Sequence, residues 1–308
     1  MVKKRTTKEK LTIGIPRALF YYKKPYFWPT FFEELGCSVI ISPPTQREIL
    51  ETGCKNSEIE SCLPVKVLQG HIFYLLDKKI DYLFVPRIIS LRENHSSCPK
   101  FFGLPDLAKL VSKKEVKILS PTIDFNKEDF NKTAFWLGWS LTNGFPLKRF
   151  KIIKAAYKNA WQKEKQAKEE LNKNYLNQIE SLERKVVLIS HPYNLYDDFI
   201  NLKIKEKLEK NGLEVLTIDA LPFEFQTTFS HWDFASEMLN QAKEISKRAI
   251  SGAIQISSFG CGCDSVIKEF IERIFREKKI PFLSLMIDEH TAEAGLITRL
   301  EAFVDTLN

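Results

Sequence analysis

The stretch AIQISSFGCGCDS, residues 253–265, contains the pattern that decides the fold. It opens with a short apolar run, bends at two glycines and leads into a helical pattern over residues 266–278. Gly260 and Gly262 allow a sharp backbone turn and leave space beside the two cysteines of the stretch. A strand, a glycine turn and a helix in this order predict one unit of an α/β fold, with two thiols on the turn.

Other short apolar runs extend this pattern along the chain. They end at proline, glycine or polar residues, and the helical segments between them include 31–35, 65–76 and 299–307. The runs that predict strands are 11–15, 38–41, 82–85, 116–119, 185–190, 213–219 and 282–288. Strands that are short, apolar on both faces and separated by helices are typical of parallel sheets covered on both sides.

A different pattern occupies the middle of the chain. Large apolar residues recur at helical spacing from 150 to 182, with no glycine or proline between them. This predicts one long amphipathic helix, or two helices broken near the middle. The predicted fold class is therefore α/β, with two Rossmann-like domains of mostly parallel sheets joined by a long helix. The predicted boundaries are 1–148 for the first domain, 149–184 for the helical linker and 185–308 for the second domain.

Composition limits the classes of function. The 308 residues are 44% hydrophobic and 28% charged, which is typical of a soluble globular protein. No apolar run is long enough for a membrane span or a signal peptide, so we expect a cytoplasmic protein. The net charge of +7 comes with mixed lysines and glutamates over residues 151–185, which favours a solvated helix face. We therefore expect neither membrane insertion nor specific nucleic-acid binding.

Six cysteines in a cytoplasmic chain favour metal binding, redox chemistry or plain burial over structural disulfides. Cys62 stands at the entrance of a predicted helix, and Cys98 is followed by a proline, which is common where a cysteine binds a cluster. Both lie on turns beyond strands, as Cys261 and Cys263 do. In α/β sheets, ligands bind beyond the carboxyl ends of the strands. Four thiols from two domains then meet across a cleft, and the alternative is a set of separate buried thiols.

The remaining two cysteines have less distinctive surroundings. Cys37 lies between a helix end and a strand, where a small buried residue is the expected role. Cys54 lies in a polar segment that we interpret as a loop, and it is open to either role. For a shared site, dispersed ligands at a domain interface suit a [4Fe–4S] cluster better than structural zinc, which usually binds to close ligand pairs.

Short blocks of the sequence resemble those of a known family. In chain order they are IGIPRAL (13–19), CLPVK (62–66), GH (70–71), PR (86–87), CPKF (98–101), GLPD (103–106), FGCGCDS (259–265), DEHT (288–291), Gly295 and TRLEAF (298–303). Together they resemble the acyl-CoA dehydratase activase-related proteins. These proteins are relatives of the cluster-bearing subunits of 2-hydroxyacyl-CoA dehydratases and of the double-cubane cluster proteins.

The resemblance implies Rossmann-like domains with a cubane-type cluster between them, and a partner ATPase that delivers low-potential electrons. Its motif cysteines match Cys62, Cys98, Cys261 and Cys263, which the resemblance assigns as cluster ligands. A double-cubane cluster needs more cysteines than these, so a single [4Fe–4S] cluster is favoured, with zinc as a further alternative. The chain has no Walker-type phosphate loop, so ATP hydrolysis is expected in a separate activase-type protein.

The function that follows is electron transfer, or reduction of a small-molecule or acyl-CoA substrate, in an ATP-dependent reductase or a dehydratase-related component. The alternative is a non-catalytic interaction module stabilised by zinc or a cluster. Whether the chain is itself an enzyme stays open, and the long helix is compatible with a homodimer. The candidates to surround the cluster are Arg17, His71, Arg87, Glu289 and His290, each of which also has a structural interpretation as a capping, pairing or core residue.

Overall fold

The computed structural model describes residues 10–112, 116–181, 183–221, 225 and 231–307. In the first half of the chain, four parallel strands form a sheet in the order β2-β1-β3-β5. Their bounds are Thr12–Ile15 (β1), Ser38–Ile41 (β2), Tyr82–Phe84 (β3) and Lys117–Leu119 (β5). The helices of this half are η1 (Leu19–Lys23), α1 (Phe27–Glu34), α2 (Arg47–Asn56), α3 (Leu63–Leu76), α4 (Pro99–Val111) and α5 (Phe130–Leu141).

The second half contains another four-stranded parallel sheet, in the order β10-β9-β7-β8. Its strands are β7 (Lys185–Ile189), β8 (Glu214–Thr217), β9 (Gly252–Ser258) and β10 (Phe282–Ile287). All residues of β7 and β9 are buried, because helices and neighbouring strands enclose the two central strands. The helices are α7 (Pro192–Leu195), α8 (Ile204–Lys210), η2 (Ile218–Ala220), α9 (Asp233–Ile245), α10 (Gly262–Glu277) and α11 (Glu293–Val304).

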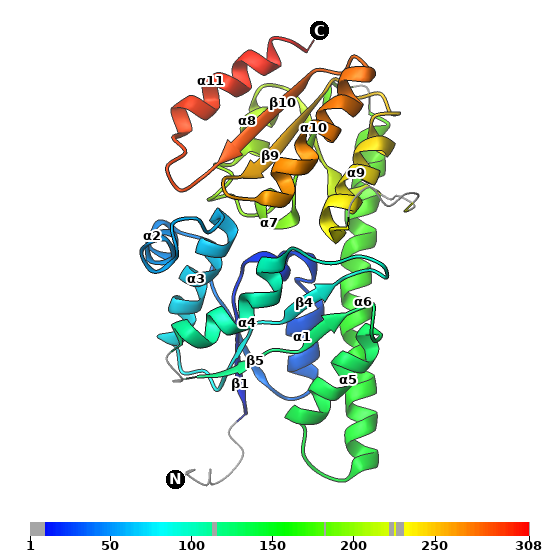
Figure 1. Ribbon diagram of the computed structural model, residues 1–308. Coiled ribbons are helices and arrows are strands. Elements are labelled where there is room, and N and C mark those ends of the chain that lie inside the picture. The colour runs from blue at the N-terminus through cyan, green and yellow to red at the C-terminus, as the bar shows by residue number, and fades with distance from the viewer. Residues whose placement is uncertain (1–9, 113–115, 182, 222–224, 226–230, 308) are drawn as a thin grey trace.

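A single helix, α6 (Pro146–Ile179), runs along one side of both sheets (Figure 1). It packs on α1 and α5 in the first half and on β8 and η2 in the second. The Phe27 ring on α1 lies 5.7 Å from Tyr157 and 5.3 Å from Trp161 of α6, measured between ring centroids. These contacts bury part of the apolar stripe that the sequence pattern predicted. The packing of α6 on elements of both halves joins them.

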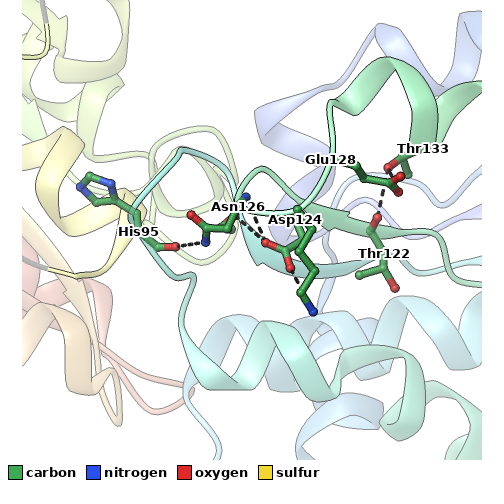
Figure 2. Close-up of polar contacts among 8 residues, drawn as sticks. His95, Thr122, Asp124, Asn126, Glu128 and Thr133 are labelled. Atoms are coloured by element: carbon green, nitrogen blue, oxygen red, sulfur yellow. Dashed lines mark hydrogen bonds and ion pairs between the residues drawn. The ribbon is translucent and has the colours of Figure 1, made fainter.

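A small two-stranded parallel sheet, β4 (Arg87–Ser90) with β6 (Thr122–Asp124), lies beside the first main sheet. The loop after β4 leads to Cys98 and is held from two directions. Nδ2 of Asn126 donates to the His95 carbonyl at 2.8 Å (Figure 2). From the second half, Oδ2 of Asp233 accepts a hydrogen bond from the Ser97 hydroxyl at 2.7 Å. The backbone immediately before Cys98 is therefore fixed to both halves of the molecule.

The predicted α/β fold with mostly parallel sheets is confirmed, and the long central segment forms one helix. Its predicted end at Leu182 lies outside the described residues. The interpretation of the segment around Cys54 as a loop was wrong, because Cys54 lies in helix α2, whose polar composition hides its helical character. Arg87 is the first residue of strand β4. The division into 1–148, 149–184 and 185–308 remains a proposal.

Of the helices in the described ranges, none combines the length and the apolar character that a bilayer span requires, the 34-residue α6 included.

Candidate functional site

Three cysteines stand at helix N-termini. Cys62 immediately precedes α3, Cys98 precedes α4 and Cys261 precedes α10, while Cys263 lies in the first turn of α10. A proline in the first turn of α3 and of α4 fits these positions, because the first turn of a helix needs no backbone donor there. Each helix N-terminus carries partial positive charge, which favours a thiolate or another anion beside it.

The four cysteines line one small pocket, which we call the thiol pocket. Cys62 and Cys98 come from the first half of the chain, and Cys261 and Cys263 come from the second. The other residues that line it are Leu19, Val65, Lys100, Phe101, His191, Tyr193, Trp232, Phe234 and Ala235. Cys62 and Cys263 are buried, whereas Cys98 and Cys261 are partly exposed. The donor set, four sulfurs within an aromatic wall, fits a thiolate-ligated metal or cluster.

Close backbone packing brings the two halves together at this pocket. Gly260 has a φ of +75°, and a Cβ atom built on it would lie 3.3 Å from the Cα atom of Cys62. A side chain at this position would be strained and crowded, so glycine is required at the turn. Across the same contact, Nζ of Lys100 donates to the Gly260 carbonyl at 3.2 Å. The glycine turn therefore sets how near Cys261 lies to Cys62.

The thiols have different proton affinities. A hydrogen bond from Cys263 lowers the pKa of Cys98 to about 6, with help from the Lys100 amide and charge. The same bond raises the pKa of Cys263. Burial raises the pKa of Cys62 and of Cys261. Metals bind the thiolate form of cysteine. A cation in the pocket would therefore stabilise all four sulfurs as anions.

A buried histidine and aspartate extend the donor set. Nε2 of His191 lies 2.7 Å from Oδ1 of Asp264, and the His191 ring stacks on Tyr193 with 4.9 Å between centroids. Ligand atoms of His191, Cys261 and Asp264 all lie within 4.8 Å of one another. Among the described residues, Nδ1 of His191 and Oδ2 of Asp264 have no hydrogen-bond partner. These three side chains offer a second way to bind a metal ion at the same place.

The residues expected around the cluster lie outside the lining of the thiol pocket. Arg87 donates to the Phe102 carbonyl and to Asp106 of α4, the latter at 2.7 Å. The Arg17 guanidinium lies over the Tyr21 ring, 5.6 Å from its centroid. Arg87 therefore has the structural role of pairing with an acidic residue, here Asp106.

The turn after β10 connects the second half to α3. Glu289 forms an ion pair with Lys66, a lysine that is only 5% exposed. The backbone amide of His290 donates to Oδ1 of Asp288 at 2.9 Å, within a turn that leads toward α11. Glu289 therefore contributes to the contact between the halves, and the His290 side chain is exposed.

His71 lies in the core of the first half and gives stability a pH dependence. Its Nε2 atom is 3.0 Å from Oγ1 of Thr45, and burial followed by the charge of Arg17 lowers its pKa to about 3. The unfolded chain then binds a proton that the folded chain does not, so stability is lost as the pH falls below 6.5. From this group alone we expect the free energy of unfolding to fall by about 2 kcal/mol between pH 7 and pH 5.

Urea unfolding at these two pH values tests the expectation. The variant His71→Gln should remove this part of the pH dependence, because glutamine does not titrate. The matched control is His290→Gln, which changes an exposed histidine and should keep the wild-type pH dependence. Equal pH dependence in wild type and His71→Gln would show that the buried imidazole does not resist protonation.

Sequence reasoning missed three residues of the thiol pocket region: Lys100, His191 and Asp264. His191 lies two residues beyond the end of β7, at the same sheet edge as the glycine turn after β9. Its position beyond a predicted strand was the available signal. The pairing with Asp264 joins residues 73 positions apart, which no local pattern reveals.

Comparison with solved structures yields weak likenesses. ZnuA matches with a TM-score of 0.30 and 14% identity, over 96% of this chain and 97% of that chain. The Zn(II)-bound ZnuA-like domain of Streptococcus pneumoniae AdcA has a TM-score of 0.29 and 13% identity, over 97% of this chain and 98% of that chain. The laminin-binding protein of Streptococcus agalactiae has a TM-score of 0.29 and 12% identity, over 97% and 100%. Scores of this size carry no argument about fold or ligand.

Comparison by sequence is more informative. No curated protein matches the chain significantly. A family model does match, over residues 12–221, and it describes a CoA enzyme activase uncharacterised domain. Cys62 and Cys98 lie inside the matched residues, and Cys261 and Cys263 lie beyond them. The match spans more than half of the chain, so this protein belongs to the CoA enzyme activase uncharacterised domain family.

Proposed function

We propose that this protein is an iron–sulfur protein in which Cys62, Cys98, Cys261 and Cys263 hold one [4Fe–4S] cluster between its two halves. The observation that carries the proposal is that these four thiols, which come from distant parts of the chain, line one pocket. A cubane-type cluster supplies one-electron transfer at low potential. The protein's own contribution is to bind, bury and electrostatically tune the cluster.

Several groups at the thiol pocket support this role. Lys100 and the N-termini of α3, α4 and α10 bring positive charge to the sulfurs, which offsets the negative charge of a thiolate-ligated cluster. Phe101, Tyr193 and Phe234 form apolar walls that limit water near the sulfurs. Burial, charge and hydrogen bonds to sulfur are the properties by which a protein sets a cluster potential.

The partner that fits this role is a separate ATP-dependent activase, which would supply one electron at a time. The electron would pass to a small molecule or an acyl-CoA substrate, in a reductase or dehydratase-related system. A cytoplasmic location, and assembly as a homodimer, belong to the same proposal. The family description, which names CoA enzyme activases, supports the link with such a system.

Metal analysis tests the proposal directly. The full chain is purified without oxygen, and iron, acid-labile sulfide and zinc are measured, with EPR spectra before and after dithionite reduction. The expected result is about four irons and four sulfides per chain with a reducible EPR signal. A protein that takes up neither iron nor sulfide after reconstitution with both would contradict it.

A second candidate function is a zinc-stabilised interaction module that performs no redox chemistry. The observation that favours it is the group formed by His191, Cys261 and Asp264, whose ligand atoms lie within 4.8 Å of one another. The thiol pocket has a volume of ≈ 30 Å³, which is on the scale of a single ion or water molecule. One zinc per chain without sulfide would support this candidate and exclude the cluster.

A further inference from the structure

A much larger cavity lies behind the thiol pocket. It is a cleft of ≈ 1480 Å³, which we call the large cleft. Its walls come from η1, from α6 and from the segment between β7 and α8. The two cavities share walls, because Leu19 and His191 line the thiol pocket while Tyr21 and Pro192 line the large cleft. The two cavities are therefore lined by nearby residues of the same two chain segments.

The lining of the large cleft contains eight cationic and seven acidic side chains. Of eight cations in its lining, four have ion-pair partners: Lys23, Lys165, Lys203 and Lys207. The other four have no carboxylate partner within the described part of the chain, and they are Arg17, Lys24, Lys158 and Lys168.

The acidic residues of the cleft are largely engaged. Six of the seven have hydrogen-bond or ion-pair partners in the protein. The partners are side chains or the backbone amides at the start of α1. The six residues are Glu164, Glu169, Asp197, Asp219, Glu237 and Glu293. The seventh, Asp198, is exposed at the edge of the cleft. Of the six, Glu169, Glu237 and Glu293 are paired with lysines, whereas the other three accept hydrogen bonds from neutral groups. Half of the cationic side chains in the lining therefore have no carboxylate within ion-pair distance among the described residues.

Lys24 occupies the most confined of these cation positions. Its Nζ atom lies 4.1 Å from the centroid of the Trp161 ring. Burial lowers the pKa of Lys24 to about 8, and the like charge of Lys168 acts in the same direction. The other charged groups that face it are Glu164, Lys23 and Glu237, and both acids already have partners. The attraction of Glu164 is the largest charge effect on Lys24, and an anion between Lys24 and Lys168 would add attraction for both ammonium groups.

Further along the same wall, Nε of Arg17 is buried and has no hydrogen-bond partner among the described residues. Its guanidinium lies over the Tyr21 ring. Arg17 is also one of the residues that line the cleft, and a guanidinium beside an aromatic ring is suited to an oxygen atom of a bound molecule.

We propose that the large cleft binds an organic anion, with its acidic group between Lys24 and Lys168, a further oxygen near Arg17, and its apolar body along Trp161 and Tyr21. The ligand class is thus a molecule with an apolar or aromatic body and a carboxylate, sulfonate or phosphate group. This site goes beyond the proposed function of the thiols. It can be tested in metal-free protein, so the two proposals can fail separately.

The test compares two fluorescent probes of similar shape. 8-Anilinonaphthalene-1-sulfonate is an aromatic anion, and N-phenyl-1-naphthylamine lacks the acidic group. Wild-type protein should bind the sulfonate more tightly than the uncharged amine. The double variant Lys24→Gln/Lys168→Gln should weaken sulfonate binding by roughly tenfold, the effect of losing a charge-assisted hydrogen bond, and leave the amine unchanged.

The matched control is Lys154→Gln, an exposed lysine on the same helix that does not line the cleft. It should bind both probes as the wild type does. Lys168→Gln alone, at an exposed position, should weaken sulfonate binding even if the double variant fails to fold, and circular dichroism reports folding. No sulfonate binding by wild type, equal affinity for both probes, or an equal loss in Lys154→Gln would overturn the proposal.

Discussion

Replacement of Cys261 or Cys263 by serine is expected to abolish stable cluster loading. Serine keeps the size of the side chain but replaces a soft thiolate with a hard hydroxyl, which iron–sulfur clusters bind poorly. Iron should fall from about four per chain to a small residue, and acid-labile sulfide should fall with it. Both are measured on anaerobically reconstituted protein, with circular dichroism to show that each variant is folded.

The matched control is Cys37→Ala. Cys37 is buried between α1 and β2, outside the lining of the thiol pocket. Its loss should leave the iron and sulfide content at the wild-type level. Normal loading in both serine variants would refute the ligand assignment, and complete loss of iron in folded Cys37→Ala would show that a thiol outside the pocket is needed.

The second large effect is expected for Gly70→Ala, which should strongly destabilise the first half. Helices α2 and α3 cross where their backbones touch. A Cβ atom on Gly70 would lie 1.9 Å from the carbonyl oxygen of Ile49, and one on Gly53 would lie 2.0 Å from that of Lys66. The obstacle is backbone in both cases, so no rotamer change relieves it. The helices must separate, at a cost of about 3 kcal/mol or more.

Urea unfolding of Gly70→Ala and of Gly103→Ala measures this effect with its control. Gly103 lies inside α4 at an exposed position, and a Cβ atom there meets nothing within 4 Å. Alanine at 103 should stabilise by up to about 1 kcal/mol through its better helix propensity. Similar stability for the two alanine variants would mean that α2 and α3 do not touch as described. Because α3 starts directly after Cys62, Gly70→Ala should also impair cluster loading.

Elements with strong local signals were predictable from the sequence. The central strand β7 is apolar after Lys185, and β9 carries apolar side chains at Ala253, Ile254 and Ile256. Helix α6 has a long apolar stripe without internal glycine or proline. The short strands β4 and β6 were not recognised, because three or four residues beside Pro86 and Pro121 show no periodicity. Helix α2 was missed because it buries only Ile49 and Gly53.

The candidate site was predictable in its components but not in its assembly. Each of Cys62, Cys98, Cys261 and Cys263 was expected on a turn beyond a strand, and all four line one pocket. Their neighbours depend on contacts between distant segments, which the sequence does not display. The His191 contact to Asp264 is an example, since it arises only when β7 and β9 lie side by side.

The uninterrupted helix α6 is a rigid connection between the two halves along one edge of the molecule. Its 34 residues contain proline only at the first position and no glycine, so it lacks the usual points at which helices kink. Its N-terminal half is packed on α1 and its C-terminal half on β8. Pulling the two halves apart would require this rod to bend or its packed side chains to slip. We therefore expect thiols contributed by opposite halves to stay at a nearly constant separation.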